Sequence, residues 1–347
     1  MTKTKKLLTA LILSAIIISS SGCEFPENTP VIGSEAEVSA SSESSSSLPE
    51  SSSGAEITVV PESSEPEETV EAEPVLEPVF QLSSQSVERG GYFIIKAENV
   101  DLSGFVFKDF LGNDRSFFEK EGAWYCFVPI KTSTSAGYYP LKIVSEEFEY
   151  KTTVTVLDRN FKKQYLVVAQ ETLDVTLEDE EASIAFDKFF QDHRWTFSEK
   201  PLWKGEFVKP LGDSWYKETT SFGTFRTFSN GDTEWHNAID MAVGGGTPIY
   251  ATNGGTVIFA DWLGVTGNTV VIDHGCGILS WHYHLHKINV AEGDYIEKGT
   301  VIGTVGTTGL STGNHLHFGI TVGGVFVDPN HFFGTEPNFD FEKVKTE

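Results

Sequence analysis

The chain has 347 residues, a formal net charge of −25, 39% hydrophobic residues and only 3 cysteines. This length allows more than one domain, and so few cysteines exclude a scaffold held together by disulfides. The charge is unevenly spread, because residues 24–80 hold 14 glutamates and no lysine or arginine. The acidic balance therefore reflects one segment, and it argues against a nucleic-acid-binding protein.

The N-terminus has a basic start followed by a short apolar segment. The apolar run covers residues 7–18, and small residues then lead to Cys23. About 20 apolar residues are needed to span a bilayer, so residues 1–22 read as a secretory signal. The segment resembles a lipoprotein signal, which implies cleavage before Cys23 and a diacylglycerol on its sulfur, although Ser20 replaces the usual leucine. Ordinary signal cleavage that leaves Cys23 free is the alternative.

Residues 23–80 are rich in serine, glutamate and proline and hold few aromatic residues. Such a composition buries too little apolar surface to offset the entropy lost on ordering, so we expect a disordered linker. As a flexible coil, the 57 residues after the cysteine would span about 40 Å on average. This reach suits a tether that holds a globular unit away from a membrane.

Residues 81–158 carry short runs of β-branched and aromatic residues separated by glycine, asparagine and aspartate. The runs that predict strands are 92–96, 105–107, 124–128, 138–144 and 148–156. Their spacing is typical of a small immunoglobulin-like β-sandwich. We expect most of the aromatic side chains to lie in its core, and we interpret the unit as a spacer or positioning domain.

Residues 159–205 interrupt the strand pattern with one predicted helix. Thr176 to Asp179 resemble a capping box, and apolar residues with helical spacing follow between Ala182 and Phe190. We expect this amphipathic helix to pack on the next domain, where it could cover a groove.

Residues 206–335 form the last large unit, which a short tail over 336–347 follows. Its valine- and isoleucine-rich runs are 256–259, 269–272 and 300–303. These runs alternate with glycine, asparagine and aspartate, which predicts a mainly β domain of antiparallel sandwich or barrel-like type. We expect residues 207–212 to be its first strand. Cys126 and Cys276 fall in different units, so we expect both to be reduced and buried.

Seven of the 9 histidines lie between His236 and His317. They fall mostly in three short groups, and the first group also holds a carboxylate. The groups are His236-Asn-Ala-Ile-Asp240, His282-Tyr-His284-Leu-His286 and His315-Leu-His317. Histidine is the commonest metal ligand, and two imidazoles with one carboxylate leave the fourth position of tetrahedral Zn²⁺ open for catalysis. Together the groups predict a catalytic zinc site.

Local geometry limits how these side chains can meet. Side chains alternate faces along a strand, so His315 and His317 would point to one side, roughly 6.6 Å apart. One of them can bind a metal while the other meets the attacking water or the substrate. His236 and Asp240 can meet on a helical turn or across a bent loop, but not on a flat strand.

Alternation would also place His282, His284 and His286 on one strand face, with Trp281 and Tyr283 on the other. A half-exposed strand edge explains such a pattern without any function. A metal-binding lipoprotein that uses the three histidines for metal capture is one alternative function.

Seven ordered blocks lie between residues 205 and 333. They are Phe222-Gly-Thr-Phe-Arg226, His236-Asn-Ala-Ile-Asp240, Gly246-Thr-Pro-Ile-Tyr-Ala251, Gly267-Asn-Thr-Val-Val-Ile-Asp-His-Gly275, His282-Tyr-His284-Leu285, Gly293-Asp-Tyr-Ile-Glu-Lys-Gly-Thr-Val-Ile-Gly303 and Ser311-Thr-Gly-Asn-His-Leu-His-Phe-Gly319. Their order resembles the lysostaphin-type zinc metallopeptidases, which cut peptide bridges in bacterial peptidoglycan. The resemblance covers roughly the last two fifths of the chain and does not extend to the rest.

The resemblance makes His236, Asp240 and His317 the zinc ligands and His284 and His315 the catalytic histidines. It implies metal-assisted hydrolysis of an amide bond. One histidine would accept the proton of the attacking water, and the other would hydrogen-bond the oxyanion. Which histidine does which stays open.

The chain departs from the family pattern at three positions. Ala238 replaces a glycine, which removes backbone freedom for positive φ. His282 replaces a tyrosine and could alter oxyanion support or compete for the metal, and Gly319 replaces a common glutamate. None of these changes removes a metal ligand.

The sequence therefore predicts a surface-anchored zinc metalloendopeptidase that hydrolyses stem peptides or cross-bridges of peptidoglycan. We expect an extracytoplasmic monomer that is anchored to the bacterial membrane through Cys23, faces the cell wall and binds no nucleic acid. The alternative is a catalytically silent homologue that binds or activates other cell-wall hydrolases. Such homologues typically lose metal ligands, whereas this chain keeps them.

Overall fold

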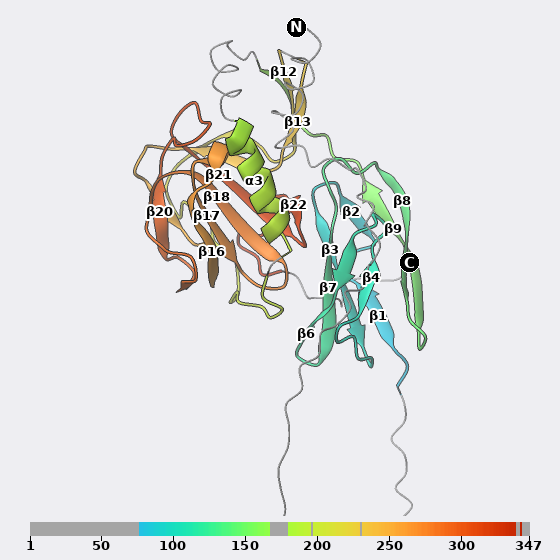
Figure 1. Cartoon of the computed structure of the whole chain (residues 1–347). Coiled ribbons are helices and arrows are strands. Elements are labelled where there is room, and N and C mark those ends of the chain that lie inside the picture. Colours follow the sequence, from blue (N-terminus) through green and yellow to red (C-terminus); the bar gives the residue numbers. More distant parts are fainter. Residues whose placement is uncertain (1–75, 167–179, 196, 230, 338–340, 342–347) are drawn as a thin grey trace, which may run out of the picture. The chain divides into compact units, whose positions relative to one another are not determined.

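A computed structural model describes residues 76–166, 180–195, 197–229, 231–337 and 341. The predicted signal, Cys23, nearly all of the predicted linker and the predicted helix cap lie outside these residues. The part that is described is mainly β, as predicted (Figure 1). Within it, no helix has the length and apolar character needed to cross a bilayer.

The N-terminal β unit confirms the predicted run of short strands. Its strands are β1 (Val79–Leu82), β2 (Ser86–Glu88), β3 (Tyr92–Glu98), β4 (Val106–Lys108), β5 (Asp114–Ser116), β6 (Phe118–Lys120), β7 (Ala123–Pro129), β8 (Gly137–Val144) and β9 (Glu149–Leu157). One sheet has the order β1-β3-β7-β6, a second has the order β2-β9-β8, and β4 pairs with β5. Strand β1 begins shortly before residue 81, where the sequence placed the start of this unit.

Strand β3 is buried on both faces, because its side chains alternate between two cores. Phe93 and Ile95 lie in the core of the N-terminal unit. Ile94 lies in a second core together with Phe127 of β7 and Phe332 near the C-terminus. The two β units thus share a hydrophobic core, and the aromatic residues of the first unit are largely core residues, as expected.

The C-terminal part contains a large antiparallel sheet. Its elements, with the strands that lead into it, are β10 (Lys163–Leu166), β11 (Lys217–Thr220), β12 (Thr224–Phe228), β13 (Thr233–His236), β14 (Ile239–Ala242), β15 (Pro248–Tyr250), β16 (Gly255–Trp262), η2 (Gly264–Thr266), β17 (Asn268–Asp273), β18 (Ile278–Ile288), β19 (Tyr295–Ile296), β20 (Val301–Val305), β21 (His315–Val322), β22 (Val325–Val327) and η3 (Pro329–His331). The main sheet has the order β11-β14-β21-β18-β17-β16-β19. A smaller sheet has the order β10-β12-β13.

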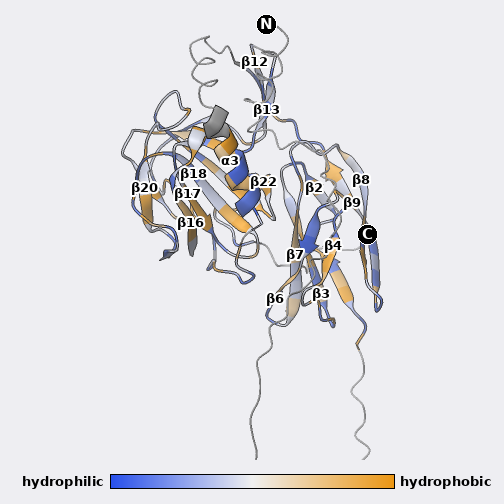
Figure 2. Ribbon diagram, viewed as in Figure 1, coloured by the Kyte–Doolittle hydropathy of each residue, from blue (hydrophilic) through white to orange (hydrophobic). Residues whose placement is uncertain are grey.

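Helix α3 (Glu180–His193) confirms the predicted amphipathic helix and packs on this sheet (Figure 1). Phe186 and Phe190 join a hydrophobic cluster with Trp281 and Tyr283 of β18. Hydrophilic residues share the helix with these apolar ones (Figure 2). The helix therefore covers the strand that carries the second histidine group.

Two local predictions had different outcomes. Residues 207–212 do not form a strand: Phe207 makes a single bridge to Phe333, and a turn follows. Pro210 has no N–H to donate, and Gly212 has a φ of 55°, so the backbone cannot continue as a strand. Cys126 and Cys276 are both free and buried, as predicted.

Candidate metal centre

The first histidine group and the third meet through strand pairing. Strands β14 and β21 are antiparallel neighbours, and their register places Asp240 directly opposite His317. His236 ends β13, and a short bend at residues 237–238 brings it back towards Asp240. The bend is the looped alternative that the spacing of His236 and Asp240 left open.

Three side-chain atoms converge at this place. Oδ1 of Asp240 lies 3.0 Å from Nε2 of His236 and 2.8 Å from Nδ1 of His317. The two ring nitrogens are 3.3 Å apart. Ligand atoms about 2.0–2.1 Å from a tetrahedral zinc lie roughly 3.3 Å from one another. The spacing and the donor types both fit a zinc ion, so this cluster could bind a metal.

The protonation states also suit metal binding. Burial raises the pKa of Asp240, but the charge and hydrogen bonds of His236 and His317 outweigh this and hold the pKa well below its usual value. Burial lowers the pKa of His317 to about 4, against the opposing effect of Asp240. At neutral pH the carboxylate is therefore ionised and the His317 ring is neutral, the states in which both can bind a metal.

His284 and His315 stand beside this cluster. Their ring centroids are 4.8 Å apart, and Nε2 of His315 lies 3.8 Å from Oδ1 of Asp240. Nδ1 of His284 lies 2.8 Å from the carbonyl oxygen of Thr308, and Nδ1 of His315 lies 2.8 Å from that of Gly313. A carbonyl only accepts, so each Nδ1 carries a hydrogen and each neutral ring keeps a free electron pair on Nε2.

His284 reaches the site through a β-bulge. Its φ is 64°, and the pairing of β18 with β17 shifts between Asn268 and Val270 at this point. A bulge re-aims a side chain, and left-handed backbone at a residue other than glycine is typical of functional sites. Burial lowers the pKa of His284 to about 3, and the nearby His317 and His315 rings add to the effect.

The bulge makes the predicted alternation along β18 wrong. Tyr283 and His284 both reach His317: the Tyr283 ring stacks on it at 5.0 Å, and the His284 ring lies 5.9 Å away. His282 faces the other way, where its ring lies 5.1 Å from Phe318 and its Nδ1 contacts the Val270 carbonyl at 3.2 Å. The extra residue of the bulge shifts every following side chain to the opposite face.

The remaining histidines do not join the metal cluster. His274 is fully buried, and its nitrogens lie 2.8 Å from the Gly254 carbonyl and 2.8 Å from the Ser280 hydroxyl. His286 is exposed on β18. The metal-capture alternative needs His282, His284 and His286 together, and the fold does not bring them together.

Two of the departures from the family pattern are accommodated locally. Ala238 is buried, and among the described residues it is not one of those with positive φ. Gly319 lies where a Cβ atom would come within 2.9 Å of the Phe326 ring, so a larger residue would require that ring to move. The third departure, His282, is the buried residue described above.

Arg226 and Glu234 also belong to the site, although the sequence did not indicate a role for them. Nη2 of Arg226 lies 3.1 Å from Oδ2 of Asp240, and its Nη1 lies 3.0 Å from Oε1 of Glu234. Burial raises the pKa of Glu234, and Arg226 opposes that shift. The sequence block that ends at Arg226 marks this residue, but it does not indicate that the arginine contacts Asp240.

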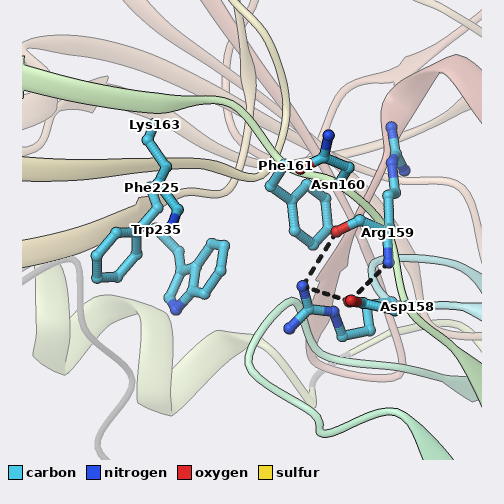
Figure 3. A pocket seen from close by; sticks show the side chains of 8 residues that line it. Asp158, Arg159, Asn160, Phe161, Lys163, Phe225 and Trp235 are labelled. Atoms are coloured by element: carbon cyan, nitrogen blue, oxygen red, sulfur yellow. Dashed lines mark hydrogen bonds and ion pairs between the residues drawn. The ribbon is translucent and has the colours of Figure 1, made fainter.

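A cavity of about 370 Å³ lies on the reverse face of the β12–β13 hairpin (Figure 3). Phe225 and Trp235 line it and are cross-strand partners. Their neighbours Arg226 and His236 point to the opposite face, because side chains alternate along each strand. The cavity is therefore separate from the metal cluster.

Residues 234–329 match peptidase family M23. The chain is 42% identical over 94 residues to the DD-carboxypeptidase/endopeptidase Mpg of Neisseria meningitidis, across 27% of this chain and 22% of that protein. It is 36% identical over 105 residues to lysostaphin of Staphylococcus simulans, across 30% of this chain and 21% of that protein. It thus spans about a fifth of the length of these curated relatives.

A solved structure of a putative peptidase M23 from Pseudomonas aeruginosa is also similar. It has 27% sequence identity and a TM-score of 0.49, over 71% of this chain and 94% of that chain. The family match covers the strands that carry His236, Asp240, His284, His315 and His317. Residues 234–329, which carry the candidate metal cluster, are therefore similar to peptidase family M23 and to lysostaphin.

Proposed function

We propose that the protein is a zinc-dependent endopeptidase that hydrolyses peptide bonds in bacterial peptidoglycan. The observation that carries this proposal is the convergence of the Asp240 carboxylate with one nitrogen each of His236 and His317, all within 3.3 Å of one another. Two further histidines, His284 and His315, flank this cluster. Relatives with the same domain include proteins named lysostaphin and peptidoglycan DD-endopeptidase ShyA.

In this proposal, Oδ1 of Asp240, Nε2 of His236 and Nδ1 of His317 would hold the metal. When bound, Zn²⁺ supplies a Lewis acid for the scissile carbonyl and lowers the pKa of a water molecule towards about 7. Three protein ligands leave one tetrahedral position for substrate chemistry. The low pKa of Asp240 keeps the carboxylate ionised across the neutral range.

His284 and His315 move the protons. Each has its Nδ1–H held by a backbone carbonyl, so the proton is exchanged at Nε2. One Nε2 accepts the proton of the attacking water and passes it to the leaving amine, while the other ring, when protonated, donates to the oxyanion. General acid–base help of this kind contributes about 10²–10⁴ in rate.

The names of the relatives support the proposed substrate class. One is named a glycyl-glycine endopeptidase and others are named DD-endopeptidases, so we propose a peptide bond of a stem peptide or a cross-bridge as the target. Peptidoglycan is an extracytoplasmic polymer, so we propose that the protein acts outside the cytoplasm. We propose that a lipid on Cys23 and the acidic segment after it tether a monomer to the membrane facing the wall.

A catalytically silent wall-binding homologue is the competing function. No observation on the described residues favours it, because the three candidate ligands and both flanking histidines are present and close together. The free cysteines Cys126 and Cys276 offer no alternative chemistry, since burial raises the pKa of both thiols and keeps them protonated.

The direct test is to incubate the purified protein with isolated peptidoglycan and identify the released fragments by mass spectrometry. We expect new amine and carboxyl ends that disappear with a zinc chelator and return when zinc is added back. His236→Ala should release no fragments above background, and His315→Ala should release them about 10²–10⁴-fold more slowly than the wild type. Zinc-loaded protein that binds the polymer but releases nothing would replace the proposal with the silent homologue.

A further inference from the structure

We infer that Arg226 is a positioning residue that restricts Asp240 to a single coordinating oxygen. The inference rests on the proposed metal site, but it does not depend on hydrolysis. It concerns the one carboxylate in the cluster, whose two oxygens have different partners. Oδ1 faces the ligand histidines, whereas Oδ2 faces Arg226 at 3.1 Å.

The β12–β13 hairpin sets the position of Arg226. The register of the hairpin places Arg226 opposite Glu234 and places Thr224 opposite His236. Side chains alternate, so Arg226, Glu234 and His236 share one face of the hairpin. The hairpin that presents a candidate ligand therefore also presents the arginine that contacts the carboxylate.

Several partners fix the guanidinium in place. Its Nη1 donates to Oε1 of Glu234 at 3.0 Å, and its Nη2 also donates to Oγ1 of Thr220 at 3.1 Å. Its Nε lies 3.4 Å from Oε1 of Gln164, on the parallel neighbour strand β10. The planar fork of arginine can hold these directions at once, which the point charge of lysine cannot.

Burial makes these contacts strong and specific. The side chains of Arg226, Glu234 and Asp240 are 17%, 4% and 10% exposed. Hydrogen bonds between ionised groups are roughly twice as strong as neutral ones, and water competes little at this depth. The Asp240 carboxylate can rotate only by giving up its bond to Arg226.

The contact with Arg226 determines how many oxygens of Asp240 can coordinate a metal. With Oδ2 held by Arg226, only Oδ1 is directed at the site of the metal. A bidentate carboxylate would occupy the position that substrate chemistry needs. Arg226 thus keeps that position open and raises the affinity of the site by orienting the carboxylate before the metal arrives.

A double variant separates this role from folding. Arg226→Gln alone leaves Glu234 buried and unpaired, so it can fail through instability. Arg226→Gln with Glu234→Gln removes both charges and keeps similar volumes and hydrogen-bonding groups. As a matched control, Arg115→Gln with Asp109→Asn removes a different buried ion pair of 2.8 Å in the N-terminal unit.

The readouts are zinc affinity and the spectrum of the cobalt-substituted protein. Zinc affinity is measured by competition with a chromophoric chelator, and folding is checked by circular dichroism. We expect a 10–100-fold loss of zinc affinity in the Arg226/Glu234 double variant, a smaller loss in Arg226→Lys, and none in the control. The visible bands of bound Co²⁺, which are intense in four-coordinate sites, should weaken in the double variant.

A folded double variant with wild-type zinc affinity and an unchanged cobalt spectrum would overturn the inference. An equal loss in the control would do so as well, because the effect would then be general destabilisation. If the wild type binds zinc but does not cleave peptidoglycan, the proposed function fails while these measurements still support or overturn the role of Arg226. If the wild type binds no zinc, both proposals fail.

Discussion

The C-terminal unit has two sets of histidines with little or no solvent exposure, and only one of them lies around a carboxylate. His236 and His317 approach a shared carboxylate, Asp240, through nitrogens that face one another. His274 and His282 are fully buried, each has a nitrogen at a backbone carbonyl, and the described structure places no carboxylate ligand between them. The carboxylate and the direction of the rings distinguish the sets, whereas histidine content does not.

Burial lowers the pKa of histidines both in and beside the candidate metal site and in the core, with different consequences. At His317, and at His284 beside it, burial leaves a neutral ring that can bind a metal or accept a proton. At His274 and His282, burial lowers the pKa to about 4 and about 3 and leaves a neutral ring that only satisfies the core. The same shift therefore supports chemistry in one place and stability in the other.

Replacing the shared carboxylate should have the largest effect. Asp240→Asn keeps the shape of the side chain but removes the charge that pairs the two ligand histidines. We expect bound zinc to fall from one ion per chain to none and peptidoglycan cleavage to become undetectable, as measured by elemental analysis and fragment release. Full zinc occupancy in this variant would show that the carboxylate does not distinguish the two sets of histidines.

Replacing a flanking histidine should separate metal binding from catalysis. His284→Ala and His315→Ala keep all three candidate ligands, so zinc stoichiometry should stay at one ion. Cleavage should fall by about 10²–10⁴, the usual contribution of a positioned acid or base. A variant that loses its zinc as well would place that histidine among the ligands.

The second set should control stability in acid. His274 and His282 have folded pKa values of about 4 and about 3, below the usual value near 6.5. The unfolded chain takes up protons below pH 6.5 that the folded chain refuses, so stability present at neutral pH is lost as the pH falls. Each histidine should cost about 2 kcal/mol of unfolding free energy between pH 7.5 and pH 5.

Denaturant unfolding at the two pH values measures this loss. His282→Gln should lose about 2 kcal/mol less than the wild type over the same interval, because glutamine does not titrate. Wild-type protein that is as stable at pH 5 as at pH 7.5 would contradict the structural role of these rings.

The exposed neighbour of the metal set should have the smallest effect. His286→Ala changes a solvent-facing side chain at the end of the second histidine group, two residues after His284. Zinc affinity and cleavage should stay at wild-type values, and stability should change by less than about 0.5 kcal/mol. A clear drop in zinc affinity would revive the idea that the second histidine group captures metal.

Much of this organisation was readable from the sequence, because local patterns determine it. Alternating apolar residues predicted the strands of both β units, and helical spacing predicted α3. The resemblance of short sequence blocks to a known family implied the grouping of His236, Asp240 and His317. Their convergence then required that β14 and β21 pair, which places Asp240 opposite His317, and that the chain bend at residues 237–238, which brings His236 to Asp240.

Two features of the site, the bulge at His284 and the contact of Arg226 with Asp240, could not be predicted from the sequence. The bulge at His284 depends on a residue other than glycine adopting positive φ, which only the surrounding sheet can enforce. The contact between Arg226 and Asp240 joins two strands through tertiary structure, so no local pattern marks it. At residues 207–212 the opposite holds, because Pro210 and Gly212 prevent the strand that the apolar residues favour.

The most direct test of the account is a zinc titration of the metal-free protein in which bound metal and peptidoglycan cleavage are followed together. If Asp240, His236 and His317 hold a single catalytic ion, cleavage should rise in proportion to bound zinc and stop rising at one ion per chain. Cleavage by the metal-free protein, or none after one ion has bound, would contradict it.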